Sequence, residues 1–251
     1  MSDFKQGPSS SQDVIFGIRP VMEAINAGKE IDRILIQKEA GPLLYELMKM
    51  ASAQNIPLVK VPVEKLNRVT RKNHQGVVCY LSSVSYASLD NIISSCFHKG
   101  ETPLVLILDR ITDVRNFGAI SRTAECMGVH AIVIPSRGSA QINSDAVKTS
   151  AGALNYIPVC REDNLKNTIT YLKNSGLSII GCTEKAEKLI SAVDMNTPAA
   201  IIMGSEEDGI SPEYMKRCDH LVKIPMTGKV QSLNVSVATG MILYEVIRQR
   251  S

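Results

Sequence analysis

Asn116 and Arg122 are the first pair of side chains in this sequence whose types and spacing could do chemistry. They follow a continuous apolar run at residues 105–108 and lie in a stretch whose apolar residues recur at helical spacing. Helical side chains lean towards the helix N-terminus, so we expect Arg122 to reach back to the strand end, where Asn116 lies. The two could then converge at one site, although an N-cap asparagine beside a solvated arginine would be an ordinary structural arrangement.

A second polar cluster follows another continuous apolar run. Glu206 is followed by two more carboxylates, and Gly204 and Gly209 flank the three, which allows tight turns and close approach of the backbone to a ligand. An acidic helix N-terminus would account for Glu207 and Asp208 through the helix dipole. It accounts less well for Glu206, because that residue follows the strand end so closely.

Ser232 and Asn234 form the third polar group, at the entrance of a final helix that we expect to extend to about Arg250. Either side chain is a good N-cap. Gly240 lies inside this helix, at a cost of about 1 kcal/mol relative to alanine. With the small residues around it, Gly240 forms a patch that could pack closely on the sheet or against another helix, including a helix of a second subunit.

The sequence gives no support to several common enzyme classes. It contains no Walker loop, no dinucleotide-binding glycine motif after a strand, no nucleophile elbow and no zinc-protease motif. The 6 cysteines and 4 histidines are dispersed without a CxxC pair, so we expect no metal site and interpret the cysteines as reduced thiols of a cytoplasmic protein. A formal net charge of +3 permits a nucleic-acid partner without requiring one.

The elements that position these side chains fall into two groups along the chain. The 251 residues suffice for one large or two modest domains. Residues 1–13 are polar and predict a flexible tail. A small unit follows, for which apolar spacing predicts strands at 34–36, 56–61 and 77–81 and helices at 20–27 and 42–53. Residues 83–102 break this pattern, and we predict a short helix and a linker there.

The apolar residues of the second unit are spaced differently. Short continuous apolar runs occur at residues 105–108, 131–134, 177–180, 199–203 and 221–224. Helical patterns separate most of them, at 119–127, 165–174 and 212–218. Uninterrupted apolar strands between helices predict an α/β fold with a parallel sheet covered on both faces. Ligands of such sheets bind at the carboxyl ends of the strands, which is where all three polar groups lie.

The three polar groups together resemble the SpoU family of RNA ribose 2'-O-methyltransferases, which belongs to the wider SPOUT superfamily. Segments 116–135, 201–213 and 224–250 match the three motifs of the family, in order and at family-like spacing. Segments 15–21 and 73–78 resemble the small L30e-like substrate-binding domain that often precedes the methyltransferase domain.

This resemblance implies a specific architecture. It predicts an L30e-like α/β domain at 14–82 that binds RNA, the linker at 83–102, and a SPOUT α/β-knot domain at 103–251 in which the chain forms a deep trefoil knot. Pattern alone would not have suggested a knot, because knots are essentially absent from protein folds. Members of the family act as homodimers through the knot and the final helix, which would suit the patch at Gly240.

The resemblance also implies the chemistry and the residues that perform it. S-adenosyl-L-methionine would be the cofactor and RNA the partner, without a metal. Carried over by position, the cofactor-binding residues are Gly204, Ile224 and Leu233. The catalytic residues are Arg122, Asn116, Glu206, Ser232 and Asn234.

Within that set Arg122 would activate the ribose hydroxyl. An arginine normally stays charged, so we favour Arg122 clamping a neighbouring phosphate that accepts the proton. Asn116, Glu206, Ser232 and Asn234 would orient Arg122 and the ribose.

The acceptor and the RNA-binding surface depend on fewer residues. Segment 139–153 resembles the members that methylate a guanosine of 23S rRNA, and we predict that acceptor. The alternatives are a SpoU-type enzyme that acts on tRNA, and a non-catalytic RNA-binding protein of the same fold. Residues 60–72 hold five cations against one carboxylate, which predicts either a basic loop that contacts phosphates or a solvated lysine face.

Overall fold

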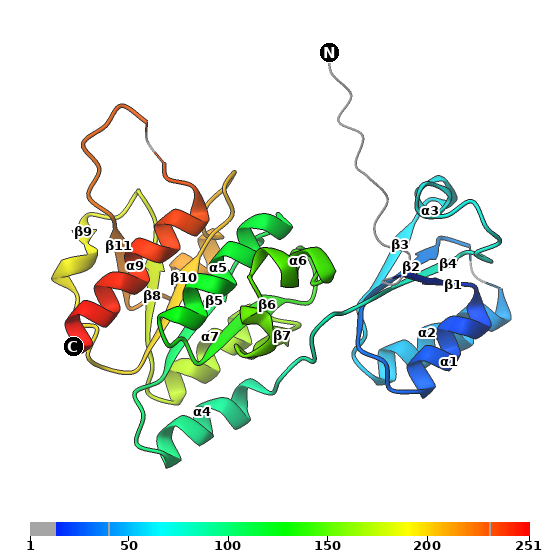
Figure 1. Ribbon diagram of the computed structural model, residues 1–251, viewed down its shortest axis with the longest axis horizontal. Coiled ribbons are helices and arrows are strands. Elements are labelled where there is room, and N and C mark those ends of the chain that lie inside the picture. Colours follow the sequence, from blue (N-terminus) through cyan, green and yellow to red (C-terminus); the bar gives the residue numbers. More distant parts are fainter. Residues whose placement is uncertain (1–13, 40, 231) are drawn as a thin grey trace. The chain divides into compact units, whose positions relative to one another are not determined.

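The computed structural model describes residues 14–39, 41–230 and 232–251, and the predicted tail at 1–13 lies outside this range. The chain divides into two compact units, one of residues up to 85 together with 142–144, and one of residues 86–141 and 145–251 (Figure 1). Within the described residues, no helix is both long enough and apolar enough to cross a membrane.

The first unit is a four-stranded sheet in the order β1-β4-β2-β3. Its strands are β1 (Val14–Phe16), β2 (Ile31–Gln37), β3 (Leu58–Val61) and β4 (Val77–Leu81). Its helices are α1 (Ile18–Asn26), α2 (Pro42–Ala53) and α3 (Val63–Val69). The central strand β2 shows why both faces are covered. Ile34 and Ile36 pack with α1 and α2, whereas Leu35 between them points to the other face and packs with Leu66 of α3, because side chains alternate along a strand.

Helix α3 corrects the prediction of a basic loop at 60–72. The helix spans seven residues, and Leu66 is its one buried residue, so its apolar face was too narrow for a helical pattern to be recognised. The five cations of this segment are all exposed. They are Lys60, Lys65, Arg68, Arg71 and Lys72.

The second unit is built on a seven-stranded sheet in the order β7-β6-β5-β10-β8-β11-β9, with every pairing parallel. Its strands are β5 (Leu104–Leu108), β6 (Ala131–Pro135), β7 (Val159–Glu162), β8 (Ser178–Cys182), β9 (Lys188–Leu189), β10 (Ala199–Met203) and β11 (His220–Lys223). The prediction of a parallel α/β sheet is confirmed, and all five apolar runs form strands. Strands β7 and β9 were not predicted, because β7 ends on charged residues and β9 is two exposed residues long.

Helices cover both faces of this sheet. They are α4 (Leu89–His98), α5 (Val114–Cys126), α6 (Ser144–Thr149), α7 (Leu165–Asn174), α8 (Pro212–Met215) and α9 (Val235–Arg250), with 3-10 turns at Ala153–Asn155 and Ile190–Ala192. Leu89 and Ile93 of α4, in the segment predicted as a linker, are buried with α7 residues against one face of the sheet. Helices α5 and α9 lie side by side (Figure 1), and a hydrogen bond between Asn116 and Asn234 joins their starts.

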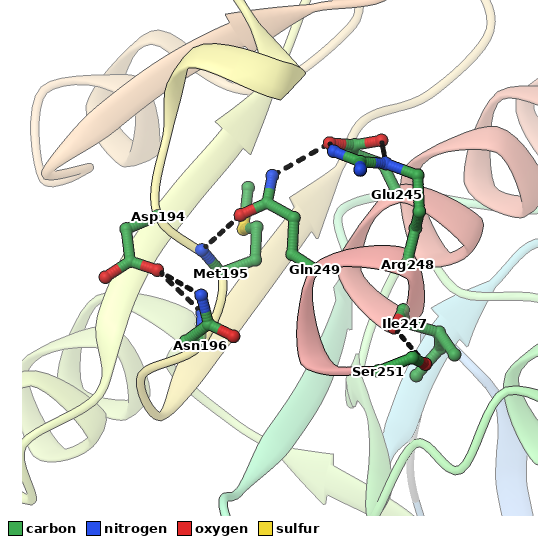
Figure 2. A network of polar contacts seen from close by, with 8 residues as sticks. All are labelled: Asp194, Met195, Asn196, Glu245, Ile247, Arg248, Gln249 and Ser251. Atoms are coloured by element: carbon green, nitrogen blue, oxygen red, sulfur yellow. Dashed lines mark hydrogen bonds and ion pairs between the residues drawn. The ribbon is translucent and has the colours of Figure 1, made fainter.

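Polar contacts fix the end of α9. The Gln249 side chain accepts a hydrogen bond of 3.0 Å from the backbone N–H of Met195, and its amide donates to Glu245 at 2.8 Å (Figure 2). Glu245 also takes both hydrogen bonds of an Arg248 fork at 2.8 Å each. Arg250 donates to three backbone carbonyls outside the helix. These contacts hold the last turns of α9 in place.

Candidate functional site

Three side chains from distant segments meet at the carboxyl edge of the second sheet. Glu206 Oε1 accepts hydrogen bonds from Asn116 Nδ2 at 2.8 Å and from Asn234 Nδ2 at 2.8 Å. Asn234 Nδ2 also lies 3.1 Å from Asn116 Oδ1. We call these three residues the amide–carboxylate trio. The structure therefore brings together three of the five residues predicted as catalytic.

Two helix starts hold the amides of the trio. Asp113 caps α5 by accepting from the backbone N–H groups of Arg115 and Asn116 at 2.7 and 2.9 Å. This corrects the N-cap alternative for Asn116, which lies in the first turn of α5 with its side chain free to reach Glu206. Asn234 is the N-cap of α9, and Oδ1 accepts from the backbone N–H of Ser236 at 3.0 Å. The helix begins at this point because the side chain satisfies an otherwise unpaired donor.

The carboxylate of the trio projects from a closed turn. Ser205 and Gly209 exchange two backbone hydrogen bonds of 3.1 and 3.0 Å, and Ser205 Oγ accepts from the N–H of Asp208 at 3.1 Å. A Cβ at Gly204 would overlap the backbone of Gly209, so only glycine lets the turn fold back so closely onto the strand end. We call residues 204–209 the acidic turn.

The acidic residues of this turn do not serve a helix dipole. Helix α8 begins later, at Pro212, and Glu213 is the acidic residue of its first turn. Asp208 instead forms an ion pair of 2.9 Å with Arg110, a residue that sequence reasoning did not single out. The available signal was a charged Asp109–Arg110 pair directly after a buried strand, but its partner lies 98 positions away.

A cavity of about 540 Å³ opens beside the trio. It is lined by the ends of β8, β10 and β11, by the acidic turn and by the start of α9. Gly204, Ile224 and Leu233, the residues predicted to bind a cofactor, all line it, as do Glu206 and Ser232. A volume of roughly 300–1,000 Å³ is typical of small-molecule sites. A smaller cavity of about 270 Å³ is lined by Asn116 and Glu206 among others, so Glu206 borders both cavities.

Arg122 is not hydrogen-bonded to the trio among the described residues. Its side chain is exposed on α5, and within the described part of the chain it makes no hydrogen bond or ion pair. No hydrogen bond joins Arg122 to Asn116 among the described residues, and six helical positions separate the two by about 9 Å along the axis and about 240° around it. Their convergence stays a prediction. Ser232 borders the larger cavity but is not part of the trio.

A cysteine nucleophile finds no support at this site. Cys182 borders the larger cavity, and burial raises the pKa of its thiol, so it stays protonated and weakly nucleophilic.

Cys96, Glu101 and His130 are a group of potential metal ligands in the described residues. His130 Nδ1 accepts a hydrogen bond from the Leu104 N–H at 3.1 Å, which leaves the ring proton on Nε2, 3.5 Å from Glu101. A ligating histidine almost always donates from its second nitrogen, so this ring is arranged as a donor to the carboxylate and not as a metal ligand.

Family models match both units of the chain. The model described as the SpoU rRNA Methylase family matches residues 103–244. The model described as RNA 2'-O ribose methyltransferase substrate binding matches residues 14–87. Each match covers one of the two regions whose sequence motifs resemble the family.

Relatives are similar over nearly the whole chain. A Bacillus subtilis (strain 168) protein, YacO, whose name assigns it to the TrmH family of tRNA/rRNA methyltransferases, is 35% identical over 244 residues, 97% of this chain and 98% of its own. A Synechocystis tRNA/rRNA methyltransferase, slr0955, is 36% identical over 95% of this chain and 63% of its own length.

Solved structures share the fold. The SpoU methyltransferase AviRb from Streptomyces viridochromogenes, in complex with AdoMet, superposes with a TM-score of 0.60 at 24% identity, over 94% of this chain and 90% of its own. The A. aeolicus TrmH/SpoU tRNA modifying enzyme gives a TM-score of 0.55 at 32% identity, over 64% of this chain and 84% of its own. The predicted two-domain SPOUT architecture is thereby confirmed.

Proposed function

Because this chain belongs to the SpoU rRNA methylase family of RNA methyltransferases, we propose that it transfers a methyl group from S-adenosyl-L-methionine to a ribose 2'-hydroxyl, and that the acceptor is a guanosine of 23S rRNA. The observation that carries this proposal is the amide–carboxylate trio, whose Glu206 lines the larger cavity. The trio unites one residue from each of the three motif segments, as a single site for cofactor and acceptor requires. A 23S rRNA acceptor would place the enzyme in the cytoplasm.

The larger cavity fits the cofactor in its chemistry as well as its size. Its walls include apolar side chains such as Ile224, Leu233 and Ile242, which suit the flat face of an adenine. Glu184 and Glu206 are among the carboxylates of the lining, which outnumber its lysines. An acidic lining suits a ligand that carries an ammonium and a sulfonium beside one carboxylate. When bound, S-adenosyl-L-methionine supplies an electrophilic methyl carbon on its sulfonium.

The chain's own residues then position and activate the acceptor. Asn116 and Asn234 bind the same oxygen of Glu206, which fixes the carboxylate at the boundary of the two cavities. In this position Glu206 can accept a hydrogen bond from the incoming ribose and orient it towards the larger cavity. Arg122 is exposed and makes no ion pair among the described residues, so its guanidinium is available to a phosphate of the RNA, and that phosphate accepts the hydroxyl proton.

The domain at 14–82 is proposed to bind the RNA. The exposed cations around α3 give it a basic face, and neutralised phosphates release counterions, which favours binding. His74 does not belong to this face. It is buried, and its ring bonds Asn67 at 2.9 Å and the N–H of Gly76 at 3.0 Å, which is a structural arrangement.

We propose a homodimer through α9. Val237, Met241 and Tyr244 recur at spacings of four and three residues and are 52%, 45% and 61% exposed. An apolar stripe of this kind on one helix face suits a second copy of the same helix. Met241→Glu should convert a dimer to a monomer in sedimentation velocity experiments. A wild-type protein that sediments as a monomer at micromolar concentration would contradict the proposal.

The deciding experiment is methyl transfer to defined RNAs. Purified protein is incubated with methyl-labelled S-adenosyl-L-methionine and either 23S rRNA or total tRNA, both from cells that lack the protein. Modified positions are mapped by the alkali resistance of 2'-O-methylated linkages. We expect one labelled guanosine in 23S rRNA. Label in tRNA alone would overturn the acceptor, and RNA binding without transfer would favour the non-catalytic alternative.

A further inference from the structure

All three nitrogens of the Arg110 guanidinium donate hydrogen bonds, and two of them donate to the acidic turn. Nη1 donates to Asp208 Oδ2 at 2.9 Å and Nη2 donates to the carbonyl of Gly209 at 3.1 Å. The third nitrogen, Nε, donates to Asp109 Oδ1 at 3.2 Å. All three nitrogens therefore have acceptors, and two of these acceptors belong to the turn that carries Glu206. A fork of this geometry fixes orientation as well as distance, which a lysine ammonium would not do.

Asp109 binds Arg110 and also the backbone just beyond the acidic turn. Its side chain is 2% exposed, and while Oδ1 accepts from Arg110, Oδ2 accepts from the backbone N–H of Ser211 at 2.6 Å. The two residues that follow β5 thus hold the segment at Asp208, at Gly209 and at Ser211. These contacts leave the turn little freedom to rotate about its base at Gly204.

The backbone of Arg110 is unusual. Its φ is 61°, in the left-handed region that residues with a Cβ rarely adopt. Such a conformation persists only where surrounding contacts determine it, and it occurs preferentially at functional sites. The contacts of the guanidinium, together with the buried Asp109, are contacts of this kind.

We propose that Arg110 is a positioning residue for methyl transfer, which acts through Asp208 and Gly209 on the placement of the Glu206 carboxylate. This inference rests on the proposed function. Glu206 must meet two amides from other segments, Asn116 on α5 and Asn234 on α9, at 2.8 Å each. A small rotation of the acidic turn would break both hydrogen bonds, so the clamp that Arg110 forms sets the geometry of the trio.

The test uses the strained backbone to separate positioning from stability. Arg110→Gly removes the clamp but relieves the left-handed strain, so the fold should be retained. We expect kcat to fall by about 10- to 100-fold, with an unchanged KM for RNA and a melting temperature no lower than that of Arg110→Ala. Arg110→Lys, which keeps one point charge near Asp208, should recover part of kcat.

A double-mutant cycle tests the route of the effect. Asp208→Asn should lower kcat in the wild-type background and have no further effect in Arg110→Gly, because the two residues act as one clamp. Arg217→Ala removes an exposed arginine elsewhere in the same unit and should match the wild type. Additive losses, or an Arg110→Gly enzyme with wild-type kcat, would overturn the proposal.

Hydrogen exchange distinguishes failure of this inference from failure of the proposed function. Amides in the peptide of residues 204–211 should exchange faster in Arg110→Gly than in the wild type, whether or not the protein methylates RNA. Exchange that is unchanged there would reject the clamp even for an active enzyme. A wild-type protein that transfers no methyl group would reject the proposed function, while faster exchange would still support the role of Arg110 in holding Glu206.

Discussion

Glu206 Oε1 and Asn116 Nδ2 lie 2.8 Å apart although 90 positions separate the two residues in the chain. Glu206→Ala removes the acceptor that joins the two asparagines. We expect methyl transfer to fall about 100-fold, because loss of positioning by about 1 Å has an effect of that size. The rate of methyl transfer is measured under single-turnover conditions. Glu187→Ala, which removes an exposed carboxylate elsewhere in the same unit, is the control. Equal rates in the two variants would exclude a role for the trio.

Arg122 is expected to matter for the reaction and not for the fold. Because its side chain is exposed and makes no ion pair among the described residues, Arg122→Ala should leave the melting temperature unchanged. Methyl transfer should be abolished, whereas binding of S-adenosyl-L-methionine, measured by calorimetry, should survive. Full activity of the variant would remove Arg122 from the mechanism.

The basic face around α3 should govern RNA affinity. Reversing Lys65 and Arg68 to glutamate should weaken RNA binding and make the slope of log affinity against log salt shallower by about 1 for each phosphate that the protein no longer neutralises. Affinity for the cofactor should not change. Lys29→Glu, an exposed change outside this face, is the matched control for each single reversal, Lys65→Glu or Arg68→Glu. If Lys29→Glu weakens RNA binding as much as a reversal on the basic face does, the effect comes from net charge alone.

Gly240 faces helix α5 of its own chain. A Cβ at this position would lie 3.6 Å from Thr123 Cγ2, which is ordinary van der Waals contact. Gly240→Ala should therefore raise the free energy of unfolding by about 0.5–1 kcal/mol, since glycine is unfavourable inside a helix. Chemical denaturation measures this. The larger Gly240→Leu should instead force α5 and α9 apart and destabilise the protein, and a leucine variant as stable as the wild type would show that the two helices have room for a larger side chain.

The Arg248 fork gives α9 a pH-dependent contribution. Hydrogen bonds from Arg248 and Gln249 lower the pKa of Glu245 to about 2. A carboxyl with a depressed folded-state pKa stabilises the protein above its ordinary pKa of about 4.3, and this stability is lost as the pH falls towards 2. Melting temperatures of the wild type and Glu245→Gln should therefore differ most above pH 5 and converge near pH 2. A difference that is independent of pH would contradict the assignment.

Five of the seven strands of the second sheet could be predicted, because burial on both faces leaves continuous apolar runs. The start of α5 could not be predicted. Asp113 and Asn116 are both possible N-caps, and the helical spacing of apolar residues becomes clear only after both of them. The residues of the trio were singled out by their places after apolar runs or at a helix entrance, and the family motifs supplied their roles. Their bonding could not be predicted, because it depends on how two helix starts and a turn meet in space. The pairing of Arg110 with Asp208 could not be predicted, because the charged Asp109–Arg110 pair after a buried strand does not identify a partner 98 positions away.

The Asn234 side chain has two roles, in the start of α9 and in the amide–carboxylate trio. Its oxygen caps α9, and its amide nitrogen reaches Glu206 and Asn116. The first turn of α9 therefore cannot fray without opening the mouth of the cavity. Gentle warming or dilute urea would therefore abolish the activity of such a protein while its sheet is still folded. Loss of turnover would report the unfolding of a single helical turn.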